Sequence, residues 1–231
     1  MNLSNPSQDH RLRLGIFGGT FNPIHRGHIQ VAKDVLRLYR MTRICFLPCA
    51  SPPHKTEKGL AEAKDRYHMV GLALAGQSDL VVSDVEIRRP GPSYTIDTLR
   101  HFKRQEAQRM QLFFILGLDA FLEIHTWKSY RDMFRLAAFI VMGRPQTEPS
   151  TQPWTTKAVD FARRRISEEY ELAASGDVLM HPRNEPIHLA LVTPVPISSS
   201  QLREMIRQDQ PYKDWIDPSV AAFIERKGLY R

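Results

Sequence analysis

Apolar runs of strand length alternate with segments of helical periodicity along most of the chain. The run QLFFILG at 111–117 is apolar almost throughout, which is typical of strands buried on both faces of a parallel sheet. After the first run, Ile29, Ala32 and Leu36 recur at helical spacing and give one helix a single apolar stripe. This alternation predicts an α/β fold in which helices cover both faces of a parallel sheet. Strands are predicted over 12–17, 43–48, 79–87, 111–117, 138–143 and 187–193, and helices over 61–76 and from 96 onward.

Residues 145–186 interrupt this alternation. A polar stretch rich in proline, RPQTEPSTQPW, predicts a loop, and it leads to a helix that contains 159–174 and a second loop over 175–186. We therefore predict a surface excursion that carries a helix and takes no part in the chemistry. The whole chain, 1–231, is predicted to form a single domain in which residues 1–11 are a flexible tail.

The formal net charge of +7 favours anionic partners without choosing between nucleic acid, phosphorylated metabolites and membrane surfaces. No RNA-binding signature with interleaved aromatic residues is present, and no stretch approaches the roughly 18 consecutive apolar residues of a membrane span. The first residues lack the apolar core of a signal peptide. With Cys45 and Cys49 as its two cysteines, the chain is expected to be cytoplasmic, with reduced thiols, and to bind neither nucleic acid nor membrane.

The sequence GGTFNPIHRGH at 18–28 follows the first predicted strand, at the edge where open parallel sheets bind ligands. Gly18 and Gly19 allow the backbone to approach a ligand closely, and His28 lies where the N–H groups of a helix start favour an anion. The stretch is neither a P-loop nor a G-x-G-x-x-G fingerprint. The alternatives are a glycine turn with surface histidines and a zinc site of His25 and His28, although no third ligand of the usual kind is close in sequence.

A second candidate anion site follows the last predicted strand, in PVPISSSQLREMIRQ. Ser198 and Gln201 have the spacing of a capping box, which predicts that a helix begins here. Arg203 would then lie in the first turn, where a cation is unfavourable by roughly 0.3–1 kcal/mol. A polyphosphate bound by Arg203 and the serine hydroxyls would remove this anomaly. The alternative is a capped helix with a solvated arginine.

These two stretches resemble the H-x-G-H and I-S-S-T-x-[IL]-R motifs of the nucleotidyltransferase superfamily, the first in the long form typical of bacterial nicotinate mononucleotide adenylyltransferases. Ser200 replaces the usual threonine of the second motif and keeps its hydroxyl. The resemblance implies a Rossmann-like, doubly wound parallel sheet with C-terminal helices. It continues through SPPHK at 51–55, VEIRRPGPSYTIDTL at 85–99, ILGLDAFLEIHTWKSY at 115–130, MGRP at 142–145 and FIERKGLYR at 223–231.

The resemblance also implies the residues of the site, with no metal ligand among them. His25, His28, Lys55 and Arg203 are expected to be catalytic. The residues expected to bind ATP are Gly18, Gly19, Thr20, Phe21, His25, His28, Lys55, Arg144, Ile197, Ser199, Ser200 and Arg203. Those expected to bind nicotinate mononucleotide are Thr95, Gly117, Asp119 and Trp127, and to these we add Lys128.

The residues expected at the mononucleotide also have structural interpretations. Trp127 could stack on the pyridine ring, which is worth roughly 0.5–1.5 kcal/mol beyond burial, or it could be a core tryptophan at a helix end. Asp119 could bind ribose hydroxyls or cap a helix, and Thr95 could be an N-cap, a contact to the substrate carboxylate, or both. The resemblance does not imply Lys128. We include it because its charge is predicted to favour nicotinate over the uncharged nicotinamide.

The implied reaction joins ATP and nicotinate mononucleotide to give deamido-NAD and pyrophosphate, a step of NAD biosynthesis, by in-line attack on the α-phosphorus. The attacking phosphate has a second pKa of about 6 and is ionised near pH 7, so neither a strong base nor a side-chain nucleophile is required. Catalysis would come from alignment and charge stabilisation, with His28 the most important residue. Mg²⁺ is expected to be held mainly by substrate phosphates.

Three alternatives stay open on this evidence. A related adenylyl- or cytidylyltransferase could use another acceptor, such as phosphopantetheine or nicotinamide mononucleotide, although SYTIDTL and HTWKSY argue against it. A nucleic-acid-binding protein would use the positive charge but would leave both anion loops unexplained. A non-catalytic nucleotide sensor would share the fold, but the joint presence of the two histidines, Lys55 and Arg203 argues against it.

Overall fold

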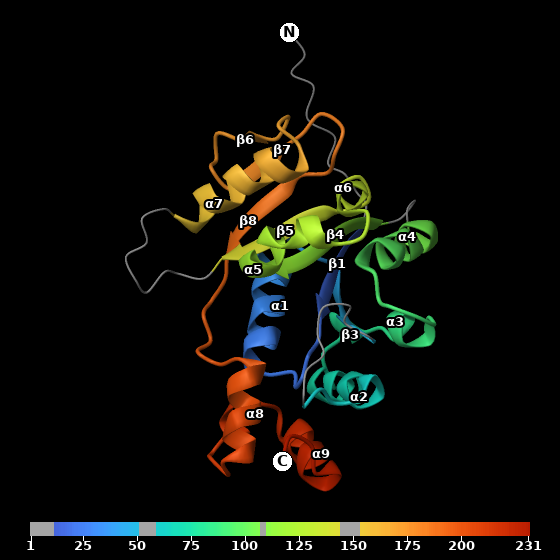
Figure 1. Ribbon diagram of the computed structural model, residues 1–231, viewed down its shortest axis with the longest axis vertical. Helices are drawn as coiled ribbons and strands as arrows, with labels where there is room; N and C mark the ends of the chain where they lie inside the picture. Colours follow the sequence, from blue (N-terminus) through green and yellow to red (C-terminus); the bar gives the residue numbers. More distant parts are fainter. Residues whose placement is uncertain (1–11, 51–58, 107–109, 144–152) are drawn as a thin grey trace.

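The computed structural model describes residues 12–50, 59–106, 110–143 and 153–231. Its centre is an eight-stranded sheet in the order β3-β2-β1-β4-β5-β8-β7-β6, of which the first six strands are parallel (Figure 1). The six parallel strands follow the doubly wound order of Rossmann-like folds, which confirms the predicted fold class. The strands are β1 (Leu12–Gly19), β2 (Arg43–Pro48), β3 (Leu80–Val82), β4 (Met110–Gly117), β5 (Ala138–Gly143), β6 (Glu171–Leu172), β7 (Val178–Met180) and β8 (Ile187–Leu191).

Helices cover both faces of this sheet (Figure 1). One face packs against α1, α2, α8 and α9 to form a first core, and the other packs against α4, α5, α6 and α7 to form a second. Within β4, Phe113 and Ile115 belong to the first core and Phe114 to the second, so the strand is apolar on both faces. The helices are α1 (Arg26–Leu38), α2 (Ala63–Ala73), α3 (Val85–Arg88), α4 (Thr95–Glu106), α5 (Leu118–Leu122), α6 (Tyr130–Met133), α7 (Trp154–Phe161), α8 (Ser199–Arg207) and α9 (Pro218–Lys227). No helix in the described ranges is both long enough and apolar enough to cross a membrane.

The strand predicted over 79–87 is wrong in its second half. Strand β3 ends at Val82, opposite Phe46 of β2, and the chain then turns into α3. Ser83 starts this turn, because its Oγ accepts a hydrogen bond from the Val85 N–H at 3.3 Å. Since β3 is an edge strand with a single neighbour, nothing keeps the chain extended once its pairing with β2 ends.

The helix predicted to contain 159–174 lies nearer the start of the chain. Helix α7 begins at Trp154, continues as one π-helical turn (Ala162–Ile166), and ends where Ser167 takes an extended conformation. The later part of the predicted helix is therefore wrong, and β6 lies there instead.

Residues 153–186 are also more closely joined to the fold than a surface excursion would be. The hairpin of β6 and β7 extends the sheet beside β8, which would otherwise be its edge. Tyr170 and Leu179 are completely buried in the second core, and the Tyr170 hydroxyl donates to the Glu185 carbonyl at 3.0 Å. This segment completes the core beyond β5.

The carboxyl ends of the parallel strands meet at one edge of the sheet. Strands β1 and β4 are neighbours, and the chain leaves them toward opposite faces, from β1 to α1 in the first layer and from β4 to α5 in the second. This is the switch point of the doubly wound sheet, where such folds bind their ligands.

Candidate active site

The loop after β1 brings the two predicted histidines together at the start of α1. His25 occupies the N-cap position and His28 is the third residue of the helix, with 3.7 Å between the ring centroids. His28 Nδ1 accepts a hydrogen bond from the His25 backbone N–H at 3.2 Å. In a neutral imidazole the proton then lies on Nε2, so His28 can donate a hydrogen bond to an anion.

Two glycines let this loop fold closely on itself. A Cβ on Gly27 would lie 3.0 Å from the His25 ring, and a Cβ on Gly19 would lie 2.8 Å from the Phe21 ring. Phe21 itself has a φ of 47°, a left-handed conformation that costs a residue with a side chain roughly 1–2 kcal/mol. The glycines thus leave room for the two rings, and contacts from elsewhere must hold Phe21 in this conformation.

Arg66 of α2, a residue that sequence analysis missed, provides some of these contacts. Its side chain is completely buried, and this burial lowers the pKa of Arg66. The guanidinium donates to the carbonyls of Thr20 at 2.8 Å, Ala50 at 3.2 Å and Ala61 at 2.9 Å. One side chain thereby joins the loop after β1 to the end of β2 and the start of α2. Its partners are backbone carbonyls, which leave no signal in the sequence.

The second predicted anion loop converges on the first. The Ser199 hydroxyl donates to the Pro23 carbonyl at 2.9 Å, although the two residues are 176 positions apart. Arg203 Nη1 donates to the Asn22 carbonyl at 2.8 Å across 181 positions. The start of α8 is therefore in direct contact with the loop that carries the histidines.

Helix α8 begins as predicted, but Arg203 does not lie in its first turn. Ser198 Oγ accepts the Gln201 N–H at 3.2 Å and Gln201 Oε1 accepts the Ser198 N–H at 2.8 Å, which confirms the capping box. Arg203 is the fifth residue of the helix, so its predicted place is wrong. It is buried, and its guanidinium reaches back to Ser200 Oγ at 3.3 Å. The positive charge of Arg203 lies between the two loops. Ile197, just before the N-cap Ser198, is buried in the first core.

A cavity of about 570 Å³ opens at the switch point of the sheet. Its walls come from the ends of β1, β2 and β4, from the start of α4, and from the turn that contains Trp127. Cavities of roughly 300–1,000 Å³ are typical of small-molecule sites. The predicted site residues that line this cavity are Gly18, Gly19, Thr20, Thr95, Gly117, Trp127 and Lys128.

Trp127 and Lys128 contribute to one wall of the cavity. Trp127 packs edge-on against Phe114 of β4, with 6.3 Å between centroids, and lines the cavity as well, so its two interpretations are compatible. Lys128 Nζ lies 3.3 Å from the Asp97 carboxylate and 4.4 Å from the centre of the Tyr94 ring. These contacts hold the ammonium group against α4.

Two helix-capping interpretations are wrong. Thr95 is the first residue of α4, and the preceding carbonyl, that of Tyr94, accepts the N–H groups of the first turn. Gly117, not Asp119, is the N-cap of α5. Asp119 is exposed in the first turn of that helix and is not part of the cavity wall, so its contact with a ribose stays a prediction.

The cavity wall also contains a buried carboxyl group that sequence analysis missed. Glu86 of α3 is 5% exposed and accepts a hydrogen bond from Thr98 Oγ1 at 2.7 Å. Arg89 Nη2 donates to the same Thr98 oxygen at 3.1 Å. Burial raises the pKa of Glu86 and raises that of the Cys49 thiol, in the same wall, to about 11. Because the pattern of residues 79–87 predicted a strand, it did not indicate that Glu86 lies in a helix at the cavity wall.

Two predicted ATP ligands, Lys55 and Arg144, lie outside the described residues. Within the part of the chain that the structure covers, no three His, Cys, Asp or Glu side chains are grouped so that they could hold a metal ion. The zinc interpretation of His25 and His28 therefore finds no third ligand among these residues.

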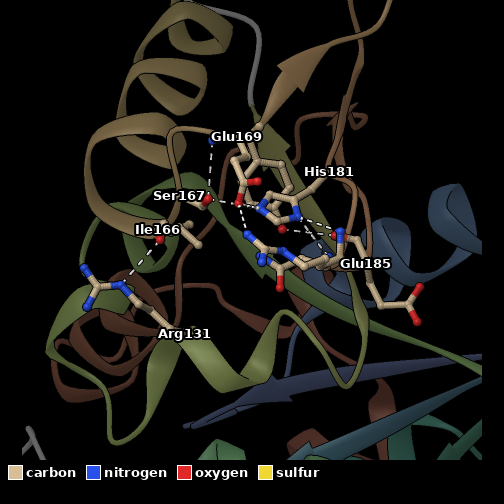
Figure 2. Close-up of polar contacts among 9 residues, drawn as sticks. Arg131, Ile166, Ser167, Glu169, His181 and Glu185 are labelled. Carbon is tan, nitrogen blue, oxygen red and sulfur yellow. Dashed lines mark hydrogen bonds and ion pairs between the residues drawn. The ribbon is translucent and has the colours of Figure 1, made fainter.

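A second group of polar side chains surrounds His181 in the segment between α7 and β8 (Figure 2). His181, Ser167 and Glu169 do not line the cavity. His181 Nε2 lies 3.0 Å from Ser167 Oγ and 3.6 Å from the Glu169 carboxylate. His181 Nδ1 accepts two backbone N–H groups, from residues 183–184, so the ring proton lies on Nε2. The imidazole therefore donates to Ser167 and cannot remove its proton. This cluster stabilises a turn and does not activate a nucleophile.

A doubly wound sheet with two converging loops, each a predicted anion site, beside a cavity at its switch point is the architecture of a nucleotidyltransferase. The model of the cytidylyltransferase-like family matches residues 16–205. A probable nicotinate-nucleotide adenylyltransferase of Desulfatibacillum aliphaticivorans is 39% identical over 223 residues, which cover 95% of this chain and 100% of that protein. One from Desulfitobacterium hafniense is 34% identical and covers 100% of both chains.

Solved structures agree on the fold. The nicotinic acid mononucleotide adenylyltransferase of Plasmodium falciparum, complexed with NaAD, has a TM-score of 0.69 at 20% identity and covers 95% of this chain and 97% of its own. The chain belongs to the cytidylyltransferase-like family and, within it, to the nicotinate-nucleotide adenylyltransferases.

Proposed function

We propose that this protein transfers the adenylyl group of ATP to nicotinate mononucleotide, which yields nicotinate adenine dinucleotide and pyrophosphate in NAD biosynthesis. The observation that carries the proposal is the direct contact between the histidine loop and the start of α8, next to a cavity of suitable size. Relatives that are 34–39% identical carry this activity in their names.

The reaction requires alignment more than acid–base chemistry. A phosphate oxygen of the mononucleotide attacks the α-phosphorus of ATP and forms a new P–O bond. The bond between the α-phosphorus and the oxygen bridging to the β-phosphate breaks, and pyrophosphate leaves with the electron pair. Because the attacking phosphate is ionised near pH 7, with a second pKa of about 6, no base has to remove a proton. The protein holds two anions in line and stabilises the charge that develops.

The side chains at the two loops suit this task. His28 offers its Nε2–H, since its Nδ1 is occupied by the backbone, and we assign it the main role at the α-phosphate. Arg203 places its charge between the loops, beside the Ser200 hydroxyl, where the triphosphate is expected. We propose that His25 and Lys55 add further contacts to the phosphates.

Mg²⁺ is the proposed cofactor. The side chains that converge on the two loops are histidines, serines and an arginine, which suit phosphate oxygens better than they suit a divalent cation. This donor set fits a cation that takes its ligands mainly from substrate phosphates and water. When bound, the cation would neutralise charge on the phosphates.

Lys128 is proposed to favour nicotinate over nicotinamide. Its ammonium group lines the cavity beside Trp127 and is held there by Asp97. A carboxylate on the pyridine ring would be attracted to this charge, whereas an amide would gain little. Since 48% of the Lys128 side chain is exposed, solvent screens the attraction and its contribution is modest.

The cytoplasm is the proposed site of the reaction. Both cysteines, Cys45 and Cys49, are free thiols, as expected in a reducing compartment. Fractionation of cells that express the tagged protein tests this location.

The test of the function is pyrophosphate release from ATP and Mg²⁺ with three acceptors: nicotinate mononucleotide, nicotinamide mononucleotide and phosphopantetheine. We expect the highest kcat/KM with nicotinate mononucleotide. A higher value with either other acceptor would change the substrate and keep the chemistry. No release with any acceptor, by protein that still binds ATP, would identify a nucleotide sensor and refute the proposal.

A further inference from the structure

We propose that Tyr230 is a positioning residue for ATP, which fixes the loop Thr20–Ile24 through the side chain of Asn22. The inference rests on the proposed function, because that function assigns this loop to the triphosphate. Tyr230 lies in the segment FIERKGLYR, which has no other role in the site described above.

Asn22 is held from several directions at once. It is 1% exposed, and its Oδ1 accepts the Tyr230 hydroxyl at 2.8 Å and the Ala61 N–H at 3.1 Å. Its Nδ2 donates to the Gly59 carbonyl at 3.1 Å, and its own carbonyl accepts Arg203 Nη1 at 2.8 Å. With donors facing Oδ1 and an acceptor facing Nδ2, the amide has one orientation. Tyr230 and Arg203 therefore both bind Asn22, Tyr230 through the Asn22 side chain and Arg203 through the Asn22 backbone carbonyl.

The end of α9 directs Tyr230 to this position. Gly228 has a φ of 63°, and the N–H groups of Gly228 and Leu229 close on the carbonyls of Glu225 at 3.2 Å and Ile224 at 3.1 Å. This pattern is a Schellman motif, which reverses the chain after the helix. Tyr230 then packs into the first core and is 8% exposed. Burial raises the pKa of Tyr230, so the phenol stays protonated and donates.

The ATP loop depends on such external contacts. Phe21, next to Asn22, has a left-handed φ of 47° that the sequence does not favour by itself. Without the Tyr230 hydroxyl the Asn22 amide has one donor fewer, and the loop can adopt conformations in which its N–H groups and histidines no longer fit the phosphates. The wall with Trp127 and Lys128 is built by other elements, so binding of the mononucleotide should not change.

Tyr230→Phe removes one oxygen atom and keeps the packed ring. Tyr212→Phe is the matched control, since Tyr212 belongs to the same core, is 9% exposed, and has its hydroxyl 3.4 Å from Glu225 rather than near the loop. We would measure kcat, the KM of each substrate, and the Tm with and without a non-hydrolysable ATP analogue. For Tyr230→Phe we expect about a five-fold lower kcat/KM for ATP, as for one lost hydrogen bond, and an unchanged KM for nicotinate mononucleotide.

The outcomes separate a positioning role from a structural one. A lower Tm with unchanged kcat and KM values, or an equal rise in both KM values, would overturn the proposal. Gly228→Ala provides a second variant, because its Cβ would meet no atom within 4 Å and acts only through the left-handed φ. It should cause the same selective defect for ATP, and no further defect when combined with Tyr230→Phe. If the wild type transferred no adenylyl group, a smaller Tm shift by the ATP analogue in Tyr230→Phe would still support the positioning role, and an equal shift would overturn it.

Discussion

Replacing Arg66 by methionine would show how strongly the loop after β1, which we propose binds ATP, is held in place. Methionine keeps most of the apolar length of the side chain and removes the guanidinium. The carbonyls of Thr20, Ala50 and Ala61 would each lose a charged donor that now lies within 2.8–3.2 Å. The perturbation therefore acts on three backbone segments at once, and one of them is the loop after β1.

Two opposing effects set the size of the change. A hydrogen bond to a charged group contributes about 1.5–3 kcal/mol, so three such bonds, which are not additive, represent about 3–6 kcal/mol. Removal of a fully buried charge also relieves its desolvation, and neutral replacements of buried charges can be stabilising. Here the Ala61 carbonyl is buried and would lose this donor, and the carbonyls of Thr20 and Ala50 are partly buried, so the first effect prevails. We expect the free energy of unfolding to fall by about 2–4 kcal/mol.

Urea unfolding measures this loss as a lower midpoint, provided that the dependence of the unfolding free energy on urea concentration is the same in both proteins. The kcat/KM for ATP measures the effect on the loop. A domain of ordinary stability, about 5–15 kcal/mol, remains folded after such a loss and can be assayed. Lys64→Met is the control, because Lys64 is exposed in the same helix and its replacement should change stability by no more than about 0.5 kcal/mol. An Arg66→Met variant with the wild-type urea midpoint and a wild-type kcat/KM for ATP would refute the reasoning.

Three further substitutions test the site. His28→Ala should lower kcat by about 10²–10³-fold, as for a lost transition-state donor, and near-normal turnover would exclude the assigned role. Burial raises the pKa of Glu86 in the folded protein above its ordinary value of 4.5. The wild-type free energy of unfolding therefore falls as pH rises from that ordinary value through the folded pKa. The urea midpoint of Glu86→Gln should therefore increase relative to that of the wild type as pH rises. A constant difference between the two midpoints across the pH range would contradict this. Lys128→Ala should lower the nicotinate-to-nicotinamide ratio of kcat/KM about two- to five-fold, and an unchanged ratio would remove Lys128 from the specificity site.

The long elements of this fold could be predicted because their signals are local. Strands β1, β2, β4, β5 and β8 lie where apolar runs predicted them, and α8 begins at its capping box. The errors fall where a short pattern fits two structures. Residues 79–87 are apolar enough for a strand, but the pairing with β2 stops at Val82 and Ser83 starts a turn. Ser167 likewise ends a helix whose periodicity continues into β6.

The sequence predicted which kinds of side chain lie at the site, but not which groups they contact. The two predicted histidines lie side by side at the start of α1, and Trp127 and Lys128 line the same cavity as the glycine loop. Arg203 was predicted as an anion ligand, but not in its place. Its helix position was inferred from a cap, but its guanidinium is directed by the Asn22 carbonyl, which belongs to a loop 181 positions away.

The sequence by itself determined the long strands and helices and indicated two loops as candidate anion sites, because periodicity, glycines and paired histidines act over a few residues. Only the tertiary structure decided how those loops are held. Arg66 and Tyr230 hold the loop after β1 through Thr20 and Asn22, and Glu86 lines the cavity from a turn that its own segment did not predict. The partners of Arg66 are backbone carbonyls, which every residue carries, so no side-chain pattern records which of them a folded chain will bring within reach.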